Sequence, residues 1–577
     1  MMPVKITERH AMNDAVKNLD APSFESFLVQ CQILSPDLLS VVRREKGKER
    51  RSFEKILLNL HLINEEQLTE LLSDFSGLPL ADLSHTDLSH VHPLFTELSP
   101  LLSTELSSHP TWLPFKKEEE TLHIAVADPL KERDRSHLTY QLSSFQCIFY
   151  VAPASQIERL RRLPEQEDPS LSDLFATLDS SSLTVPSLVS AELIPRILDR
   201  CLTEAVHQRA SDIHLETESK FIRIRLRVDG QLLLYHSFHR DFWDSFCVHL
   251  KVCSQMNIAE SRLPQSGRFS RKIEGEEIDF RVSTHPTKHG ESIVIRVLDR
   301  VKALLSLHEI GFPLPTIACL KDTLQIPQGL FIVSGPTGSG KTTTLYSILT
   351  HLNTPARNIM TLEQPIEYEL PFVRQTEIQE NSFFTFANGV RSILRQDPDI
   401  LFIGEVRDAD TAQMALRASM TGHQVYTTLH APRALGTIQR LTDLGLSSAA
   451  LAGNLKGLLS QRLIRSLCPR CRQRRPLSFQ ESCLIQEDTD QFVYDPIGCS
   501  FCHQTGYKGR FPLVEFIPCT EAFNQLILDK APLAVLEKEA RTIGYVPLAE
   551  QGIQALLEGL TSLSELCSVV SLEKEIL

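Results

Sequence analysis

The sequence of 577 residues lacks a long hydrophobic run, an excess of positive charge and an even set of cysteines. No apolar stretch approaches the roughly 18–20 residues of a membrane-spanning helix, and the polar start Met1–Asp14 has no signal-peptide core. Acidic residues outnumber basic ones, 72 to 59, which disfavours a general nucleic-acid coat. The 13 cysteines argue against a disulfide framework. We therefore expect a cytosolic protein.

The remaining composition is that of a globular, multidomain chain. Hydrophobic residues make up 42%, and at roughly 150 residues per domain the length suggests about four domains. Patterning divides the chain into an N-terminal region 1–165, a Ser- and Asp-rich linker 166–190, an α/β domain 191–303, an α/β core 304–467, a cysteine insert 468–510 and a helical tail 511–577.

A weak repeat marks the N-terminal region. Phe24–Val29 is echoed 29 residues later by Phe53–Leu58, and the apolar spacing predicts two similar helical hairpins. The basic run Arg43–Arg51 lies between them. We interpret it as a solvated turn, with a contact for an acidic partner or anionic lipid as the alternative. Farther along, Thr121–Ala127 alternates like a strand.

The segment 221–230 predicts a β-hairpin. Apolar residues alternate with Arg223, Arg225 and Arg227, and Asp229-Gly230 is a turn signal. We interpret the three arginines as a solvated sheet face.

Gly335–Thr342 fits the phosphate-loop pattern G-x-x-x-x-G-K-[ST]. An apolar strand precedes it and a helical stretch follows, as this loop requires. Its backbone N–H groups can enclose phosphate oxygens, Lys341 can reach the β- and γ-phosphates, and the Thr342 hydroxyl can bind Mg²⁺. The predicted nucleotide-binding residues are Gly335, Pro336, Thr337, Gly338, Ser339, Gly340, Lys341, Thr342 and Thr343.

Two more apolar segments end in carboxylates. Ile400–Ile403 leads to Glu405 and resembles a Walker B strand, and Ile359–Leu362 leads to Glu363. At the carboxyl end of a parallel sheet, Glu363 would face the crevice of the phosphate loop and could act as a general base. For the segment that leads to Glu405, the alternative is an ordinary core strand with a surface glutamate.

These motifs, with residues 391–399 (RSILRQDPD), 404–408 (GEVRD) and 427–430 (TTLH), resemble the secretion ATPases of the type II secretion and type IV pilus superfamily. The general secretory pathway protein E family is the most similar. The resemblance implies a hexameric motor with a PAS-like domain at 191–303 and a RecA-like domain. It implies ATP hydrolysis that drives pseudopilus assembly and protein export by a type II secretion system. The alternatives are a type IV pilus extension ATPase and a non-hydrolysing scaffold.

The resemblance also implies catalytic roles. Glu363 takes the position of the catalytic base, Glu405 the Walker B position and His430 the His-box position. Arginine fingers correspond to Arg281 and Arg296, and a further pair to Arg391 and Arg395, whose spacing of four places them on one helix face. Solvated salt bridges are the alternative for each arginine, and a satisfied polar residue at a strand end is the alternative for His430.

The chain departs from the family pattern at three places. Gln364 stands where aspartate is usual, Ser266 precedes Gly267-Arg268 in place of aspartate, and Ala431-Pro432 replace Thr-Asn after His430. The carboxylate and phosphate-binding positions are retained, so we expect activity, and a reduced rate would agree with these departures.

Two C-x-x-C pairs, Cys468/Cys471 and Cys499/Cys502, are separated by 27 residues. This pattern suits a tetrahedral structural zinc site, whereas the alternative is four unrelated buried thiols. A basic cluster surrounds the first pair and is either solvated or faces an acidic lipid or partner. It comprises Arg462, Arg465, Arg470, Arg472, Arg474 and Arg475.

The expected cofactors are therefore ATP, Mg²⁺ and Zn²⁺. The resemblance implies a homo-hexamer on the cytoplasmic face of the inner membrane. Its implied partners are the cytoplasmic domain of an inner-membrane secretion protein and a membrane platform protein, with no nucleic acid.

Some relatives bind cyclic di-GMP through an Arg-Leu-Gly repeat start and a later glycine. Here the starts are Pro22-Ser23-Phe24 and Arg51-Ser52-Phe53, with Gln32 and His61 at the second site, so we expect no cyclic di-GMP binding.

Overall fold

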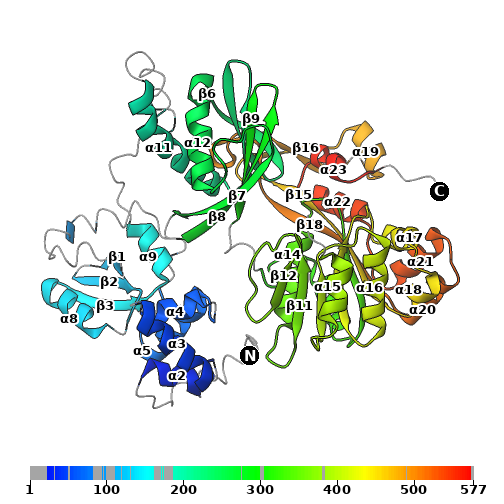
Figure 1. Cartoon of the computed structure of the whole chain (residues 1–577), viewed down its shortest axis with the longest axis horizontal. Coiled ribbons are helices and arrows are strands. Elements are labelled where there is room, and N and C mark those ends of the chain that lie inside the picture. The colour runs from blue at the N-terminus through cyan, green and yellow to red at the C-terminus, as the bar shows by residue number, and fades with distance from the viewer. Residues whose placement is uncertain are drawn as a thin grey trace. The chain divides into compact units, whose positions relative to one another are not determined.

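The computed structural model covers the whole chain. It describes residues 23–31, 33–49, 52–60, 62–81, 83, 94, 97–98, 111–118, 120–129, 131–161, 171, 173–174, 186–273, 276–298, 305–379, 384–488 and 490–572. The chain divides into two compact units, whose helices and strands are labelled in Figure 1. The first comprises residues 1–204, 217–222 and 238–292, and the second comprises 205–216, 223–237 and 293–577. Among the described residues, no helix combines the length and apolar character that a bilayer crossing requires.

The N-terminal repeat forms the expected pair of helical hairpins. Its helices are α2 (Phe24–Gln30), α3 (Pro36–Glu49), α4 (Phe53–Asn59) and α5 (Glu65–Ser76). Ser23 and Ser52 cap α2 and α4 at equivalent positions, and the following Phe24 and Phe53 are buried in one apolar core. The repeat therefore reflects two copies of one capped and packed helix start.

The expected turn at the basic run is wrong over residues 43–49, because α3 continues to Glu49. Arginine, lysine and glutamate are good helix formers, and they outweigh the single Gly47. Arg43 binds Glu25 across the hairpin, with 2.8 Å between Nε and Oε2. Arg50 and Arg51 lie outside the described residues.

A small α/β layer follows in the first unit. Its sheet has the order β1 (Trp112–Glu118), β2 (Thr121–Val126) and β3 (Gln146–Val151), with helices α8 (Glu132–Gln141) and α9 (Ala154–Arg161). Strand β2 confirms the alternation at 121–127. Glu65 of α5 accepts hydrogen bonds from the backbone and hydroxyl of Ser155, at 2.9 and 2.6 Å, and so connects the helical repeat to this layer.

Residues 186–298 contain a long helix and antiparallel strands. Helix α11 begins at Pro186, inside the segment that we interpret as a linker. The hairpin at Asp229-Gly230 is confirmed, with φ of 49° and 89°. The elements are α11 (Pro186–His207), β4 (Ala210–Thr217), β5 (Phe221–Val228), β6 (Gln231–His239), η3 (Arg240–Phe242), α12 (Trp243–Cys253), β7 (Gln265–Ile273), β8 (Glu276–Thr287) and β9 (Gly290–Leu298).

The second unit is built on a seven-stranded sheet of order β12-β11-β13-β14-β10-β15-β18. The strands are parallel except for β18, which is antiparallel to β15. They are β10 (Gly329–Ser334), β11 (Ile359–Glu363), β12 (Arg374–Glu377), β13 (Ile400–Ile403), β14 (Gln424–Leu429), β15 (Leu455–Leu467) and β18 (Tyr507–Pro518).

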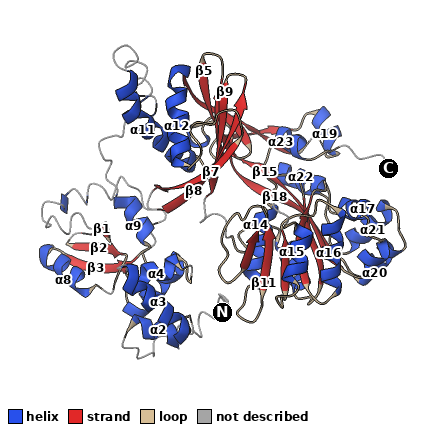
Figure 2. Ribbon diagram, viewed as in Figure 1, coloured by secondary structure: helices blue, strands red, loops and turns tan. Residues whose placement is uncertain are grey.

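Helices cover both faces of this sheet (Figure 2). Leu330 and Ile332 of β10 pack on one side, and Phe331 and Val333 pack on the other. Both faces are apolar, as a buried parallel sheet requires, and the expected mixed α/β class is confirmed. The helices are α13 (Leu314–Leu324), α14 (Lys341–Leu352), α15 (Phe386–Ile393), α16 (Ala409–Met420), α17 (Gly436–Asp443) and α18 (Ser448–Ala452).

The segment between β15 and β18 forms a small hairpin insert, and a helical tail follows β18. The insert contains β16 (Arg472–Pro476), α19 (Phe479–Ile485), β17 (Phe492–Pro496) and η5 (Ser500–Cys502). The tail contains α20 (Glu521–Leu528), α21 (Leu533–Thr542), α22 (Leu548–Leu557) and α23 (Leu563–Val569).

A buried carboxylate attaches the tail to the sheet. Glu515 of β18 is 1% exposed and accepts hydrogen bonds from Ala434 N, Leu548 N and Tyr545 Oη at 2.8, 3.2 and 3.0 Å. Burial raises the pKa of Glu515, and these hydrogen bonds oppose the rise. One side chain therefore connects β18, the start of α22 and the loop before α17.

Replacing Glu515 with alanine leaves three buried donors without their acceptor. Each such donor costs about 1–3 kcal/mol, so we expect Glu515→Ala to loosen α21 and α22. Hydrogen–deuterium exchange should become faster across residues 533–557. The exposed Glu521→Ala is the matched control and should leave this exchange unchanged. Equal protection in Glu515→Ala and wild type would contradict the prediction.

Candidate nucleotide-binding site and cysteine cluster

The predicted phosphate loop connects β10 directly to α14. Gly340 adopts φ of 87° and precedes the first helical residue, Lys341, so that the helix N-terminus opens onto the loop. Lys341 Nζ donates to the carbonyls of Gly335 and Pro336 at 2.9 and 2.8 Å. Thr342 and Thr343 follow in the first turn of α14.

The carboxyl ends of β13 and β14 bring two predicted groups together. Glu405 follows β13, His430 follows β14, and 4.0 Å separates His430 Nε2 from Glu405 Oε2. Burial lowers the pKa of Lys341, and the Glu405 carboxylate opposes this shift. Lys341, Glu405 and His430 therefore share one edge of the sheet, as Walker-type chemistry requires.

Glu405 has another partner that the sequence analysis did not assign. The Arg407 guanidinium forms an ion pair with its carboxylate, which is 17% exposed. The signal for Arg407 was present in the GEVRD motif, two residues after the glutamate. This pair neutralises part of the Glu405 charge.

Glu363 lies at the end of β11, where the sequence predicts it, but the residue is only 3% exposed. It accepts hydrogen bonds from Tyr346 Oη, from Thr361 Oγ1 at 2.6 Å and from Gln375 Nε2 at 3.0 Å. Burial raises the pKa of Glu363, and the three donors oppose the rise. Tyr346 and Gln375 were missed by the sequence analysis, because only the fold brings α14 and β12 to Glu363.

The predicted arginine fingers lie in antiparallel strands. Arg281 of β8 lies opposite Arg268 of β7 in the hairpin register. Arg296 of β9 is 58% exposed, and its Nε lies 3.1 Å from Asp212 Oδ1 of β4. Arg296 is thus held by a carboxylate of its neighbouring strand.

The expectation that Arg391 and Arg395 share one helix face is wrong. Arg391 lies in α15 and donates to Asn388 Oδ1 at 2.7 Å, but α15 ends at Ile393. Arg395 lies in the following turn, before Asp397, whose φ is 51°. The chain leaves the helix through a tighter turn, in which Arg395 N donates to the Ser392 carbonyl and Gln396 N donates to the Ile393 carbonyl. Pro398 then disfavours helical backbone at Asp397.

The arginines of β5 are ion-paired as well as partly solvated. Arg225 pairs with Glu216, and Arg223 lies 3.6 Å from the same carboxylate. Arg227 Nε lies 3.8 Å from Asp212 Oδ2. All three side chains keep 30–39% of their surface exposed. This face therefore combines solvation with carboxylates from β4.

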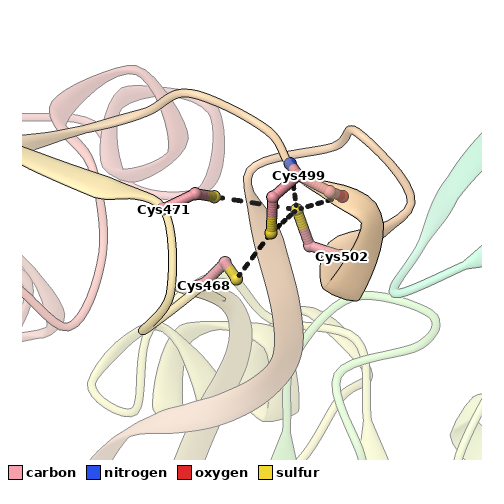
Figure 3. A group of neighbouring side chains, drawn as sticks. All are labelled: Cys468, Cys471, Cys499 and Cys502. Carbon is pink, nitrogen blue, oxygen red and sulfur yellow. Dashed lines mark hydrogen bonds between the residues drawn. The ribbon is translucent and has the colours of Figure 1, made fainter.

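The four predicted zinc ligands meet at one point (Figure 3). Their sulfur atoms lie within 4.8 Å of one another. The Cys468–Cys499 and Cys471–Cys502 separations are both 3.8 Å, and the Cys499–Cys502 separation is 3.7 Å. A tetrahedron with Zn–S bonds of about 2.3 Å has S–S edges of about 3.8 Å, so the cluster fits zinc.

Backbone N–H groups favour the ionised form of one of these thiols, Cys502. Burial opposes ionisation of Cys502, but the N–H groups of Cys499 and Gly506 each donate to its sulfur at 3.2 Å and, together with the thiols of Cys499 and Cys471, lower its pKa. The thiolate is the form that binds metal.

Much of the predicted basic cluster packs on the insert's own aromatic rings. Arg470 and Lys508 both stack on Phe501, with their cationic groups 3.9 and 4.1 Å from the ring centroid. Arg474 stacks on Phe492 at 3.7 Å. Ion pairs and further ring contacts engage Arg465, Arg472 and Arg475. The contacts with Phe501 and Phe492 are cation–π interactions that stabilise the insert itself.

The chain is similar in sequence to known proteins of secretion and pilus systems. The profile of the family described as "Type II/IV secretion system protein" matches residues 187–568, and that of the "MshEN domain" matches residues 76–170. The type II secretion system protein E of Pseudomonas aeruginosa is 40% identical over 462 residues, which are 79% of this chain and 92% of that protein. The type IV pilus assembly ATPase PilB of Myxococcus xanthus is 33% identical over 556 residues, 93% of this chain and 97% of that protein.

Removing one cysteine should abolish metal binding. We expect the wild-type chain to hold one zinc ion and Cys502→Ser to hold almost none, because a closed structural site needs four ligands. Elemental analysis of the purified chains measures this, and Cys502→Ser should also melt at a lower temperature. Cys483→Ser, an exposed thiol of the same insert, is the control. A full zinc complement in Cys502→Ser would contradict the assignment.

Proposed function

Because this chain belongs to the type II/IV secretion system protein family, we propose that it is an ATPase motor that drives protein export by a type II secretion system. The observation that carries this function is the meeting of Lys341, Glu405 and His430 at the end of a phosphate-loop sheet. The 40% identity to a type II secretion system protein E, over 92% of its length, supports the choice of system.

The residues suggest how phosphoryl transfer is assisted. In this structure the Lys341 ammonium donates to two neutral carbonyls of its own loop. The β- and γ-phosphates carry negative charges, so they attract the ammonium by a Coulomb interaction that the neutral carbonyls do not provide. Nucleotide entry therefore draws Lys341 away from Gly335 and Pro336, while the loop N–H groups enclose the phosphates.

The carboxylates have separate roles in this proposal. Mg²⁺, held by Thr342 with the help of Glu405, would neutralise charge on the phosphates. Glu363 is the proposed general base, and its three donors fix its orientation. Arg281 and Arg296 are the proposed arginine fingers, and His430 supports Glu405 at the site edge.

Finer parts of the proposal concern assembly. The chain would act as a homo-hexamer, with a PAS-like domain at 191–303 and a zinc insert at 468–510. It would work at the cytoplasmic face of the inner membrane, bound to the cytoplasmic domain of a membrane-anchored secretion protein and to a platform protein. Family membership supports this arrangement.

We also propose that the N-terminal repeat binds no cyclic di-GMP, although the chain matches the MshEN domain at 76–170. The helix starts support this, because Phe24 and Phe53 are committed to the apolar core and Ser23 and Ser52 to capping. Pro22, Gln32, Arg51 and His61 lie outside the described residues.

A type IV pilus extension ATPase is the second candidate function. The similarity to the pilus assembly ATPase of Myxococcus xanthus extends over 93% of this chain, compared with 79% for the secretion protein of Pseudomonas aeruginosa. Both candidates use the same chemistry, so the partner bound by the 1–165 region distinguishes them. A non-hydrolysing scaffold, the third possibility, would show no turnover.

Steady-state phosphate release by the assembled wild-type hexamer tests the enzymatic function. We expect turnover that depends on Mg²⁺ and falls at least about 100-fold in Lys341→Ala and in Glu405→Gln, because each removes a group that stabilises the transition state. Lys321→Ala, outside the phosphate loop, is the control and should retain turnover. Absence of turnover in the assembled wild type would favour the scaffold.

The pH dependence of turnover tests Glu363. The base acts when ionised, so turnover falls as the pH drops through its pKa, which burial raises. Removing the Tyr346 hydroxyl removes a donor that favours the ionised form. We expect Tyr346→Phe to move the acidic limb of the pH–rate profile to higher pH. Tyr426→Phe, another buried tyrosine, should leave it in place. An unmoved limb in Tyr346→Phe would assign that limb to another group.

A further inference from the structure

Gln461 of β15 lies beside the phosphate loop and is only 2% exposed. Strands β10 and β15 are parallel, with Ser334 opposite Ser460. Gln461 therefore comes one position beyond the last paired residue of β10, at the level where the loop begins. A buried amide requires partners for both its donor and its acceptor.

Both ends of the Gln461 amide bind the phosphate-loop segment. Nε2 donates to the carbonyl of Ser339 at 2.6 Å, and Oε1 accepts from Thr344 Oγ1 at 2.8 Å. Ser339 lies within the loop, whereas Thr344 lies in the first turns of α14. One side chain thus connects the loop to the helix that follows it.

The loop approaches Gln461 so closely that two of its positions have no room for a side chain. A Cβ added to Gly335 would lie 2.5 Å from the Gln461 carbonyl oxygen. One added to Gly340 would lie 2.9 Å from Gln461 Nε2. Glycine at these two positions therefore leaves room for Gln461 of β15, in addition to allowing the loop to enclose a phosphate.

The hydrogen bond to Ser339 also sets the direction of a neighbouring donor. In a planar trans peptide the C=O of one residue and the N–H of the next point in opposite directions. Because the Ser339 carbonyl points toward Gln461, the Gly340 N–H points away from β15. Backbone N–H groups of this loop are the donors that a phosphate needs.

We propose that Gln461 is a positioning residue for nucleotide binding, which clamps the phosphate loop so that the Gly340 N–H stays available to the phosphates of a nucleoside di- or triphosphate. This inference rests on the proposed nucleotide-dependent function. Gln461 itself touches the loop and acts through it.

Calorimetric titration of the full-length chain with Mg-ADP tests the clamp without requiring turnover. Gln461→Leu preserves the approximate volume and removes both hydrogen bonds, so we expect about tenfold weaker binding. Thr344→Val removes one of the bonds and should have a smaller effect. Gln424→Leu is the matched control, since Gln424 is a buried amide at the start of β14 that donates to the carbonyls of Leu324 and Ile326.

A pH series adds a readout that a general loss of stability would not produce. In Gln461→Glu the ionised carboxylate cannot donate to the Ser339 carbonyl, whereas the protonated acid can. We expect the affinity of this variant for Mg-ADP, relative to wild type at each pH, to improve as the pH falls from 8 to 6. Melting temperatures of all variants are recorded alongside.

Three results would overturn the inference. They are binding of Gln461→Leu within twofold of wild type, an equal loss in Gln424→Leu, and a Gln461→Glu affinity that does not improve at lower pH. The proposed function fails on a different result. A wild-type chain that binds Mg-ADP but hydrolyses no ATP would refute the motor function, and the positioning role of Gln461 would still hold. A wild-type chain that binds no nucleotide would refute both.

Discussion

The parallel pairing of β10 with β14 on one side and β15 on the other is the constraint on which the site depends. It places the phosphate loop between His430, which follows β14, and Gln461, which lies in β15. Because β13 pairs with β14, Glu405 reaches the same edge and comes within 4.0 Å of His430. No single loop builds this site, and the groups meet only because neighbouring strands end together.

The sheet is apolar on both faces, so burying a polar group in it costs free energy unless that group forms hydrogen bonds. Three buried side chains are held by such hydrogen bonds: Glu363, Gln461 and Glu515. Glu363 accepts three hydrogen bonds at the end of β11, and Gln461 uses both ends of its amide. Glu515 accepts three more and connects the helical tail to the loop that follows His430. Each group joins elements that are distant in sequence, so these bonds specify the fold as well as stabilise it.

Strand β15 also links the nucleotide site to the cysteine cluster. Gln461 contacts the phosphate loop, and the same strand ends at Leu467, immediately before Cys468. Beyond it, guanidinium groups stack on the aromatic rings of the insert. Within β15, Arg465 pairs with Glu565 of the tail. The insert is thus continuous with the motor core through β15 and β18, the last two strands at one edge of the sheet. Its own basic residues contribute to its packing.

The sequence by itself determined the phosphate loop, the strand-end carboxylates and the two cysteine pairs, because each is a local pattern with a fixed spacing. It also predicted the repeated helix starts at Phe24 and Phe53. It was wrong about residues 43–49, where helix propensity extends α3, and about Arg395, which lies in a turn after α15 ends at Ile393. Only the tertiary structure decided that Tyr346 and Gln375 hold Glu363 and that Gln461 supports the loop. The physical reason is that these partners come from other elements, and strand order, which no local pattern encodes, brings them together.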